Sequence, residues 1–213
     1  MFNKKQEFIE FTINKNILRF GEFTLKSGRK SPYYFNTGLC HDGQLLSDLS
    51  SYYAGYIKDN LLNYDFIFGP AYKGITLCSS ICQSLYTQHS IKSSYAFNRK
   101  EVKLHGDKGN FVGCDIKGIS LLVDDVISSG SSIIDAYNLI TASNATCSDA
   151  LVAFNRMEIG ENLMASEELK KKYGIHVHYL INLDDIYAYV KSNSKLKFHI
   201  SNMEEYISKY KGT

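Results

Sequence analysis

Hydrophobic residues are arranged along the chain in two different patterns. In several segments they recur every three or four positions, which places them on one face of an α-helix. The first of these segments opens with Asn3 and Gln6, a pair that resembles a capping box, and we expect its helix to end near Gly21. The helices predicted in this way cover residues 3–21, 45–62, 75–85, 133–140 and 166–173.

Short apolar runs between these helices predict β-strands. The most apolar of them ends in two adjacent aspartates, and glycine or polar residues bound the others. The predicted strands are residues 64–69, 94–98, 118–126, 149–155 and 176–183. Because strands alternate with helices, we predict an α/β fold in which a parallel sheet carries helices on both faces.

We expect one domain over residues 1–213, with a small cap built from the terminal segments. The N-terminal part, about residues 1–40, contains the stretch "FTLKSGRKSPYYFNTG". Ser-Gly and Ser-Pro pairs separate its aromatic runs and predict a loop or hairpin. This N-terminal part is expected to contribute to the cap over the functional site.

Composition argues against several classes of partner. The chain has 213 residues, 44% of them hydrophobic, and a formal net charge of +2. That balance gives no general attraction to nucleic acid or to a membrane surface, and no apolar run approaches the roughly 20 residues of a membrane span. The five scattered cysteines favour reduced thiols in a cytoplasmic protein over a disulfide framework.

The stretch "LLVDDVISSGSS", residues 121–132, carries the clearest chemical signal. Ligands of parallel sheets gather beyond the carboxyl ends of the strands, which is where Asp124 and Asp125 are expected. The serine and glycine residues that follow open a helix, and exposed N–H groups at such a turn suit a phosphate. Carboxylates facing hydroxyls beside a phosphate-binding turn indicate a sugar phosphate as ligand.

Other interpretations of the same stretch are weaker. "LLVDD" also matches the Walker B pattern of nucleotide hydrolases, and a pair of aspartates can simply end a strand. However, the chain contains neither the glycine-rich G-x-x-x-x-G-K-[ST] motif of those hydrolases nor the G-x-G-x-x-G motif of dinucleotide-binding proteins. Cys78 and Cys82 share a predicted helix face without further ligands at metal spacing, so buried apolar roles are favoured for them.

"VDDVISSGSS" resembles the ribose-phosphate signature of the type I phosphoribosyltransferases, which use phosphoribosyl pyrophosphate (PRPP). Ser128 and Ser131 keep the hydroxyls of that signature, whereas Ser129 and Ser132 are substitutions. The stretches "FTLKSGRKSPYYFNTG", "FGPAYKGI" and "FNRKEVKLHGDKGNFVG" are similar to the orotate phosphoribosyltransferases, and the likeness extends over essentially the whole chain. The resemblance implies phosphoribosyl transfer from PRPP to orotate, giving orotidine monophosphate and pyrophosphate in pyrimidine synthesis.

The resemblance also assigns residues to PRPP. Lys103, His105, Asp124 and Asp125 are the implied catalytic residues. Mg²⁺ is the implied cofactor, held mainly by PRPP, with no direct protein ligand and at most water-mediated contacts to the two aspartates. The implied PRPP-binding residues are Lys26, Tyr72, Lys73, Arg99, Lys100, Lys103, His105, Asp124, Asp125, Val126, Ile127, Ser128, Ser129, Gly130, Ser131 and Ser132.

Residues 99–110 concentrate cationic side chains between two predicted strands. By composition alone they form a solvated polar loop, but a long connection between core strands is more often functional. The segment resembles the mobile catalytic loop of orotate phosphoribosyltransferases, which closes over PRPP. In that family the tip of the loop serves the neighbouring subunit, so the resemblance implies a homodimer.

The orotate pocket should offer a cation for the carboxylate and aromatic packing for the ring. The family positions for this pocket correspond to Lys26, Tyr34, Phe35, Ser128 and Arg156. Without the resemblance, Arg156 at a strand end would be an ordinary surface charge. His176 and His178, which alternate along the last predicted strand, are expected to be structural.

Two further functions stay open from the sequence. A purine-salvage phosphoribosyltransferase would share the Asp-Asp loop, but it would be expected to stack its base on an aromatic residue where this chain has Arg156. A non-catalytic relative that binds PRPP as a regulator could dispense with the cations of residues 99–110, and it would be expected to show a basic face or an added DNA-binding domain. Orotate phosphoribosyltransferase is the favoured prediction.

Overall fold

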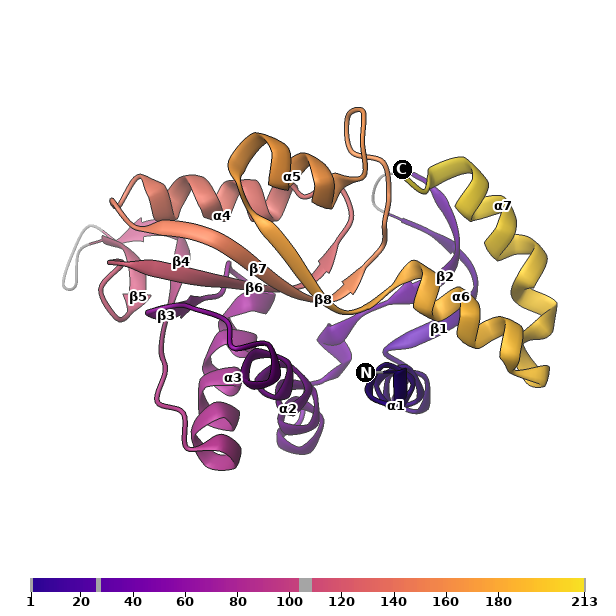
Figure 1. The fold of residues 1–213 in the computed structure, drawn as a ribbon, viewed down its shortest axis with the longest axis horizontal. Coiled ribbons are helices and arrows are strands. Elements are labelled where there is room, and N and C mark those ends of the chain that lie inside the picture. Colours follow the sequence, from indigo (N-terminus) through magenta and orange to yellow (C-terminus); the bar gives the residue numbers. More distant parts are fainter. Residues whose placement is uncertain (1, 26–27, 104–108, 213) are drawn as a thin grey trace.

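The computed structural model describes residues 2–25, 28–103 and 109–212, and Figure 1 shows their arrangement. A central sheet of six strands forms the body of the molecule. Along the sheet the order is β5 (Gly109–Gly113), β4 (Ser94–Lys103), β3 (Phe66–Phe68), β6 (Ile119–Ile127), β7 (Thr146–Asn155) and β8 (His176–Asn182). Strands β4, β3, β6, β7 and β8 are parallel, so the predicted α/β fold is confirmed.

Helices cover both faces of this sheet (Figure 1). On one face lie α2 (Gly43–Asn60) and α3 (Lys73–His89), and on the other lie α4 (Ser131–Thr141) and α5 (Ala165–Tyr173). Each pair buries its own hydrophobic cluster against the sheet. Strand β6 lies between the clusters and is buried along almost its whole length, which explains its continuous apolar sequence.

The terminal segments pack against each other at one end of the sheet (Figure 1). Strands β1 (Leu18–Thr24) and β2 (Lys30–Phe35) form an antiparallel hairpin, as "FTLKSGRKSPYYFNTG" predicts. The rings of Tyr33 on β2 and Tyr206 on the last helix lie 5.4 Å apart. The remaining elements of this region are α1 (Phe2–Asn14), the 3₁₀ turns η1 (Thr37–Leu39) and η2 (Ser194–His199), α6 (Leu183–Ser192) and α7 (Ile200–Tyr210).

The first helix is shorter than the sequence pattern predicts. It ends at Asn14 because Asn16 adopts a left-handed conformation (φ 57°), which asparagine tolerates better than most residues, and the chain then enters β1. Gly21 therefore lies within a strand. The predicted capping box is also wrong: Asn3 lies inside the helix, and the Gln6 side chain donates a hydrogen bond to Glu10.

Residues 99–110 do not form a plain loop in the described part of the chain. Strand β4 continues to Lys103, and the chain returns as β5, antiparallel to β4 at the edge of the sheet. The sheet is therefore mixed, with one antiparallel edge strand that the apolar pattern did not predict. None of the helices in the described ranges combines the length and hydropathy needed to cross a membrane.

The turn between β3 and α3 forces the backbone into a close approach. A Cβ atom added to Gly69 would lie 1.9 Å from the carbonyl oxygen of Gly74, and one added to Gly74 would lie 2.5 Å from the backbone of Gly69. Only glycine fits at either position. The two glycines thus fix residues 70–73 as a tight turn at the carboxyl end of β3.

We predict that Gly69→Ala lowers the free energy of unfolding by about 3 kcal/mol or more, because the methyl group meets backbone that cannot move aside. Gly55→Ala is the matched control, since its added Cβ within α2 meets nothing within 4 Å. That control should gain roughly 0.5–1 kcal/mol from lower chain entropy in the unfolded state. Urea denaturation of both variants measures the difference, and equal stabilities would show that the turn can relax.

Candidate active site

Asp124 and Asp125 lie at the carboxyl end of β6, and both are buried, with 8% and 7% of their surfaces exposed. The Lys73 ammonium, at the start of α3, lies 2.6 Å from Oδ2 of Asp125. The Thr37 hydroxyl donates a hydrogen bond of 3.0 Å to the same oxygen. The structure thus brings the predicted residues Lys73 and Asp125 together, and it adds Thr37 from the N-terminal segment.

Backbone contacts fix the two aspartates in place. The hydroxyl of Tyr53, fully buried on α2, donates a 2.8 Å hydrogen bond to the carbonyl oxygen of Asp124. The Asp125 amide donates to Oδ1 of the Asp124 carboxylate at 2.9 Å. The carboxyl end of β6 is therefore fixed by one hydrogen bond from α2 and by one between the Asp125 amide and the Asp124 side chain.

Asp124 binds a proton more readily than an ordinary aspartate. Burial, followed by the neighbouring charge of Asp125, raises the pKa of Asp124 from 3.8 to about 7. The Lys73 charge opposes this shift but does not offset it. Asp124 thus lies in an environment that disfavours its anionic form until a cation or a hydrogen-bond donor is placed beside it.

The loop after β6 has the geometry expected of an anion-binding turn. Ser128, Ser129 and Ser132 are exposed, and Gly130 adopts a left-handed conformation (φ 81°) immediately before α4 begins at Ser131. The turn therefore presents hydroxyl groups and backbone N–H groups at a helix N-terminus. The preceding Val126 and Ile127 differ: the Val126 side chain is partly buried against one hydrophobic cluster, and the Ile127 side chain is buried in the other.

The turn at residues 70–73 lies beside the aspartates. The buried Asn98 side chain, on β4, accepts a 2.8 Å hydrogen bond from the amide of Ala71 and so ties the turn to the next strand. Tyr72 is 73% exposed, and the Lys100 ammonium lies 6.0 Å from the centre of its ring. Three predicted PRPP residues, Tyr72, Lys73 and Lys100, therefore lie in one region.

Arg156 follows β7 and is buried, with 5% of its surface exposed. Its Nε donates to Glu158 at 2.5 Å, and its Nη2 donates to Ser31 at 3.2 Å and to Tyr206 at 2.6 Å. Burial alone would lower the pKa of Arg156, but Tyr33, Glu158 and Tyr206 raise it overall, so the guanidinium stays charged. It is part of a buried network and not the surface charge that a lone strand-end arginine suggests.

The same network joins both termini to β7. Glu158 also accepts a 2.8 Å hydrogen bond from Arg29, next to β2, and hydrogen-bonds the Tyr206 hydroxyl on α7. Within residues 2–25, 28–103 and 109–212, the Arg156 hydrogen bonds run from Nε and Nη2, and none of them uses Nη1. The position of Arg156 for a ligand is therefore set by segments from three distant parts of the chain.

The predicted aromatic residues have unequal environments. Phe35 is buried against Phe154, with ring centres 5.2 Å apart. Tyr34 is half-buried, stacks on Phe23 at 5.5 Å and lies under the Arg19 guanidinium. Tyr34 is thus accessible to a ligand, while the Phe35 ring belongs to the core.

Several predicted residues cannot be placed by their side chains. Lys26 and His105 lie outside the described residues, and for Lys103 the structure gives only its backbone at the end of β4. Arg99 is half-buried on the same strand. The prediction that residues 99–110 act on PRPP therefore stays a prediction.

Sequence reasoning missed Thr37, Tyr53 and Asn98. Asn98 directly precedes the Arg99-Lys100 pair that the resemblance assigns to PRPP, so the sequence around it did point to the site. Thr37 falls at the end of "FTLKSGRKSPYYFNTG", within a quoted motif but without a distinctive pattern. Tyr53 looked like an ordinary core residue of a helix, because nothing in the sequence shows which carbonyl its hydroxyl meets.

Comparison with known proteins decides the family. No protein-family model matches the chain. An orotate phosphoribosyltransferase of Haemophilus ducreyi is 42% identical over 207 residues, covering 97% of each chain, and one of Mannheimia succiniciproducens is 43% identical over 211 residues, covering 99% of each. The chain belongs to the orotate phosphoribosyltransferase family. The predicted enzyme class, a pentosyl-transferring glycosyltransferase of pyrimidine biosynthesis, is confirmed with it.

Solved structures agree with this assignment. The crystal structure of orotate phosphoribosyltransferase from Francisella tularensis is 38% identical and superposes with a TM-score of 0.86, covering 97% of this chain and 100% of that one. The orotate phosphoribosyltransferase of Aeropyrum pernix, at 20% identity and a TM-score of 0.65, shares the fold. The comparisons support orotate phosphoribosyltransferase and not the purine-salvage or regulatory alternatives.

The raised pKa of Asp124 predicts a pH-dependent stability in the absence of PRPP and metal. Between about pH 4 and 7 the folded chain keeps a proton that the unfolded chain has lost, so this residue's contribution to stability falls as the pH rises through that window. Asp124→Asn is neutral at every pH and keeps the acceptor for the Asp125 amide. It should therefore be more stable than the unchanged protein at pH 8, by on the order of 2 kcal/mol.

Denaturant titrations in EDTA at several pH values measure this difference. The gain should shrink as the pH falls from 7 toward 4. Asp115→Asn, at an exposed position, is the control and should show little gain at any pH. A pH-independent difference for Asp124→Asn would show that the carboxylate is not destabilised by its burial.

Proposed function

We propose that the site around Asp124 and Asp125 carries phosphoribosyl transfer from PRPP to orotate. The observation that carries this proposal is the meeting of three features at one rim of the sheet. They are a buried carboxylate pair, a phosphate-binding turn at the N-terminus of α4, and a cationic turn at Lys73. The distantly related orotate phosphoribosyltransferase of Mycobacterium tuberculosis, which shares the fold, has been crystallised with PRPP.

The carboxylates would bind the ribose. In the described structure Asp125 pairs with Lys73, whose side chain is 48% exposed and is therefore able to turn outward. When PRPP arrives, Lys73 exchanges the carboxylate for the pyrophosphate, and Asp125 accepts hydrogen bonds from the ribose hydroxyls. Lys73 then pairs with an anion and Asp125 keeps hydrogen-bond donors, which limits the cost of desolvating both groups.

The reaction breaks the bond between the anomeric carbon and the pyrophosphate oxygen, forms a bond from that carbon to an orotate ring nitrogen, and releases the proton that this nitrogen carried. Positive charge develops on the ribose as pyrophosphate leaves. The buried carboxylates stabilise the positive charge on the ribose. Lys73, Lys100 and the turn at residues 70–73 stabilise the negative charge on the leaving pyrophosphate. The Ser128–Ser132 turn keeps the ribose phosphate fixed, so the anomeric carbon stays oriented toward orotate.

Mg²⁺ fits the oxygen donors of this site. Asp124 is buried beside a second carboxylate, and both the burial and this carboxylate raise its pKa. Oxygen donors are the ligands that Mg²⁺ prefers. Asp124 and Asp125 would hold the ion through water, with PRPP oxygens as its main ligands. When bound, the ion would neutralise charge on the pyrophosphate.

Arg156 would bind the orotate carboxylate. Its guanidinium is preorganised by Glu158 and Tyr206, and Nη1 is not used in those contacts. Tyr34 supplies an accessible aromatic face. We further propose a cytoplasmic homodimer in which residues 99–110 serve the neighbouring subunit.

An assay of orotate absorbance after addition of PRPP and Mg²⁺ tests the proposed substrates, with hypoxanthine and adenine as expected non-substrates. Arg156→Lys keeps the charge against Glu158 but loses the planar pair of donors. We predict that it raises the KM for orotate about 10-fold or more, while the KM for PRPP changes little. Equal effects on both KM values would contradict the assignment of Arg156 to orotate.

The dimer proposal makes a separate prediction. Lys103→Ala and Asp125→Asn homodimers should each be nearly inactive, since each removes one charge from every site. In a mixed two-fold dimer one site carries both lesions and the other carries none. Random mixing makes half of the dimers mixed, so roughly a quarter of the unmodified activity should return.

Co-refolding of the two variants, compared with each refolded alone, measures the recovery. A mixture of the intact dimers without refolding is the control and should stay inactive. A loop that serves its own subunit predicts no recovery at any mixing ratio. That outcome would remove the trans-acting loop and leave the substrate assignment unchanged.

A further inference from the structure

Three metal-binding side chains converge at the opposite rim of the sheet from the aspartate pair. Asp149 lies on β7, and His176 and His178 lie on the neighbouring strand β8. Oδ1 of Asp149 is 2.8 Å from Nε2 of His178, and Nδ1 of His176 is 3.3 Å from the same nitrogen. Among the described residues, one ligand atom of each side chain lies within 4.8 Å of the others.

Strand register explains why the three side chains meet. Asp149 pairs directly with His176 in the parallel ladder, and His178 follows two residues later on the same face of β8. Tyr56 on α2 hydrogen-bonds His178, so this is the face of the sheet that α2 covers. The cluster therefore rests on two rigid strands and a helix rather than on a loop.

Hydrogen bonds alone do not satisfy all three side chains of the cluster. With its proton on Nε2, His178 can donate a full hydrogen bond to the Asp149 carboxylate or to the His176 nitrogen, but not to both. A cation would instead accept a lone pair from all three. Ligand atoms about 2.1 Å from a tetrahedral ion lie roughly 3.4 Å from one another. The separation between the two histidine nitrogens, 3.3 Å, matches this value, and the 2.8 Å between Asp149 and His178 would have to widen slightly.

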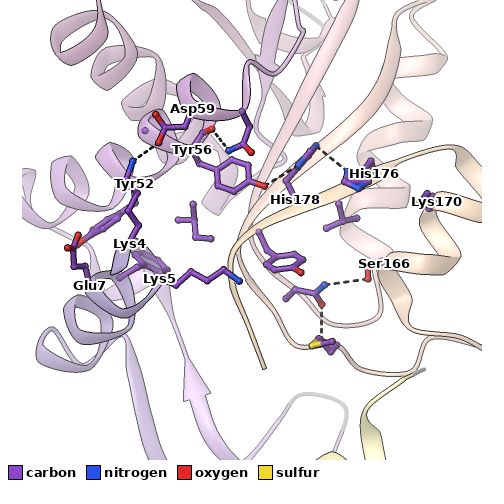
Figure 2. A pocket seen from close by; sticks show the side chains of 18 of the residues that line it. Lys4, Lys5, Glu7, Tyr52, Tyr56, Asp59, Ser166, Lys170, His176 and His178 are labelled. Carbon is purple, nitrogen blue, oxygen red and sulfur yellow. Dashed lines mark hydrogen bonds and ion pairs between the residues drawn. The ribbon is translucent and has the colours of Figure 1, made fainter. Parts of the chain in front are cut away.

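Neighbouring residues hold two of the three ligands in orientation. The Tyr56 hydroxyl lies 3.3 Å from Nδ1 of His178, which sets Nε2 toward the cluster. The Ser148 hydroxyl donates a 2.6 Å hydrogen bond to the second oxygen of Asp149. Figure 2 shows His178 between Tyr56 and His176, with the histidines at one end of a cavity. Outer contacts of this kind are typical of metal sites, where they fix the tautomer and direction of each ligand.

The cavity provides access. It has a volume of about 730 Å³ and runs beside β8 between α1, α2 and α5. His176 is exposed, whereas His178 and Asp149 are partly buried, with 14% and 27% of their side chains exposed. An ion can thus enter from solvent and keep a water in its fourth position.

We propose that Asp149, His176 and His178 bind one divalent transition-metal ion, with Zn²⁺ as the ion that best suits two imidazoles and a carboxylate. Asp149 pairs across the ladder with Leu121, at the amino end of β6, so the site lies away from Asp124 and Asp125. The ion would link edge strand β8 to β7. The bound ion would raise the stability of the folded protein and would leave orotate turnover unchanged.

The test uses full-length protein stripped with EDTA and then dialysed. Zn²⁺ titrated by calorimetry, without PRPP, should reveal a site that His176→Asn weakens at least 10-fold. His41→Asn, at an exposed position outside the cluster, is the matched control and should bind as the unchanged protein does. Tyr56→Phe, which removes only the outer contact to His178, should weaken Zn²⁺ by about 10-fold.

Two further measurements separate this site from other ligands on the chain. Co²⁺ should give a visible absorption band that His176→Asn loses and Asp125→Asn keeps. Zn²⁺ should raise the melting temperature of the unchanged protein more than that of His176→Asn, while both turn over orotate equally. His176 is exposed, so that variant is expected to fold. Unaltered Zn²⁺ affinity in His176→Asn, or no Zn²⁺ binding by the unchanged protein, would overturn the proposal.

Discussion

Two adjacent carboxylates buried at the end of one strand are the constraint on which the rest of the site depends. Placing like charges together in a poorly solvated position is unfavourable, and the raised pKa of Asp124 is its direct consequence. The fold tolerates the pair because Lys73 and Thr37 both reach Asp125. A ligand rich in hydroxyl groups and a metal ion would relieve what remains.

That constraint explains why distant segments converge on β6. The N-terminal segment supplies Thr37, α2 supplies Tyr53, and the Gly69–Gly74 approach directs Lys73 toward the strand end. Thr37 and Lys73 contact the Asp125 side chain, and Tyr53 contacts the backbone carbonyl of Asp124. The site is therefore a property of the whole arrangement, because displacing any of these elements leaves a buried polar group without its partner.

Sequence patterns predicted the parts of this arrangement that local chemistry determines. The apolar run into Asp124 and Asp125 predicted the central strand and the buried aspartates at its carboxyl end, and aromatic runs around Ser-Gly and Ser-Pro predicted the hairpin. The contacts of Tyr53 and Thr37 could not be predicted, because they depend on tertiary packing between segments far apart in sequence. The antiparallel return of β5 was missed for the same reason: a short, half-exposed edge strand has little apolar periodicity.

Arg156 shows how internal pairing shapes recognition. A buried arginine facing Glu158 has its charge largely compensated, so a carboxylate bound there, as we propose for orotate, would gain less attraction from it than from a free guanidinium. What the network supplies instead is direction, since Ser31 and Tyr206 fix Nη2 and leave the guanidinium plane with one orientation. The same principle would apply to the Lys73–Asp125 ion pair in the proposed exchange with PRPP. A site built in this way favours discrimination between ligands over raw affinity, because a ligand that cannot replace the internal partners leaves charges unpaired.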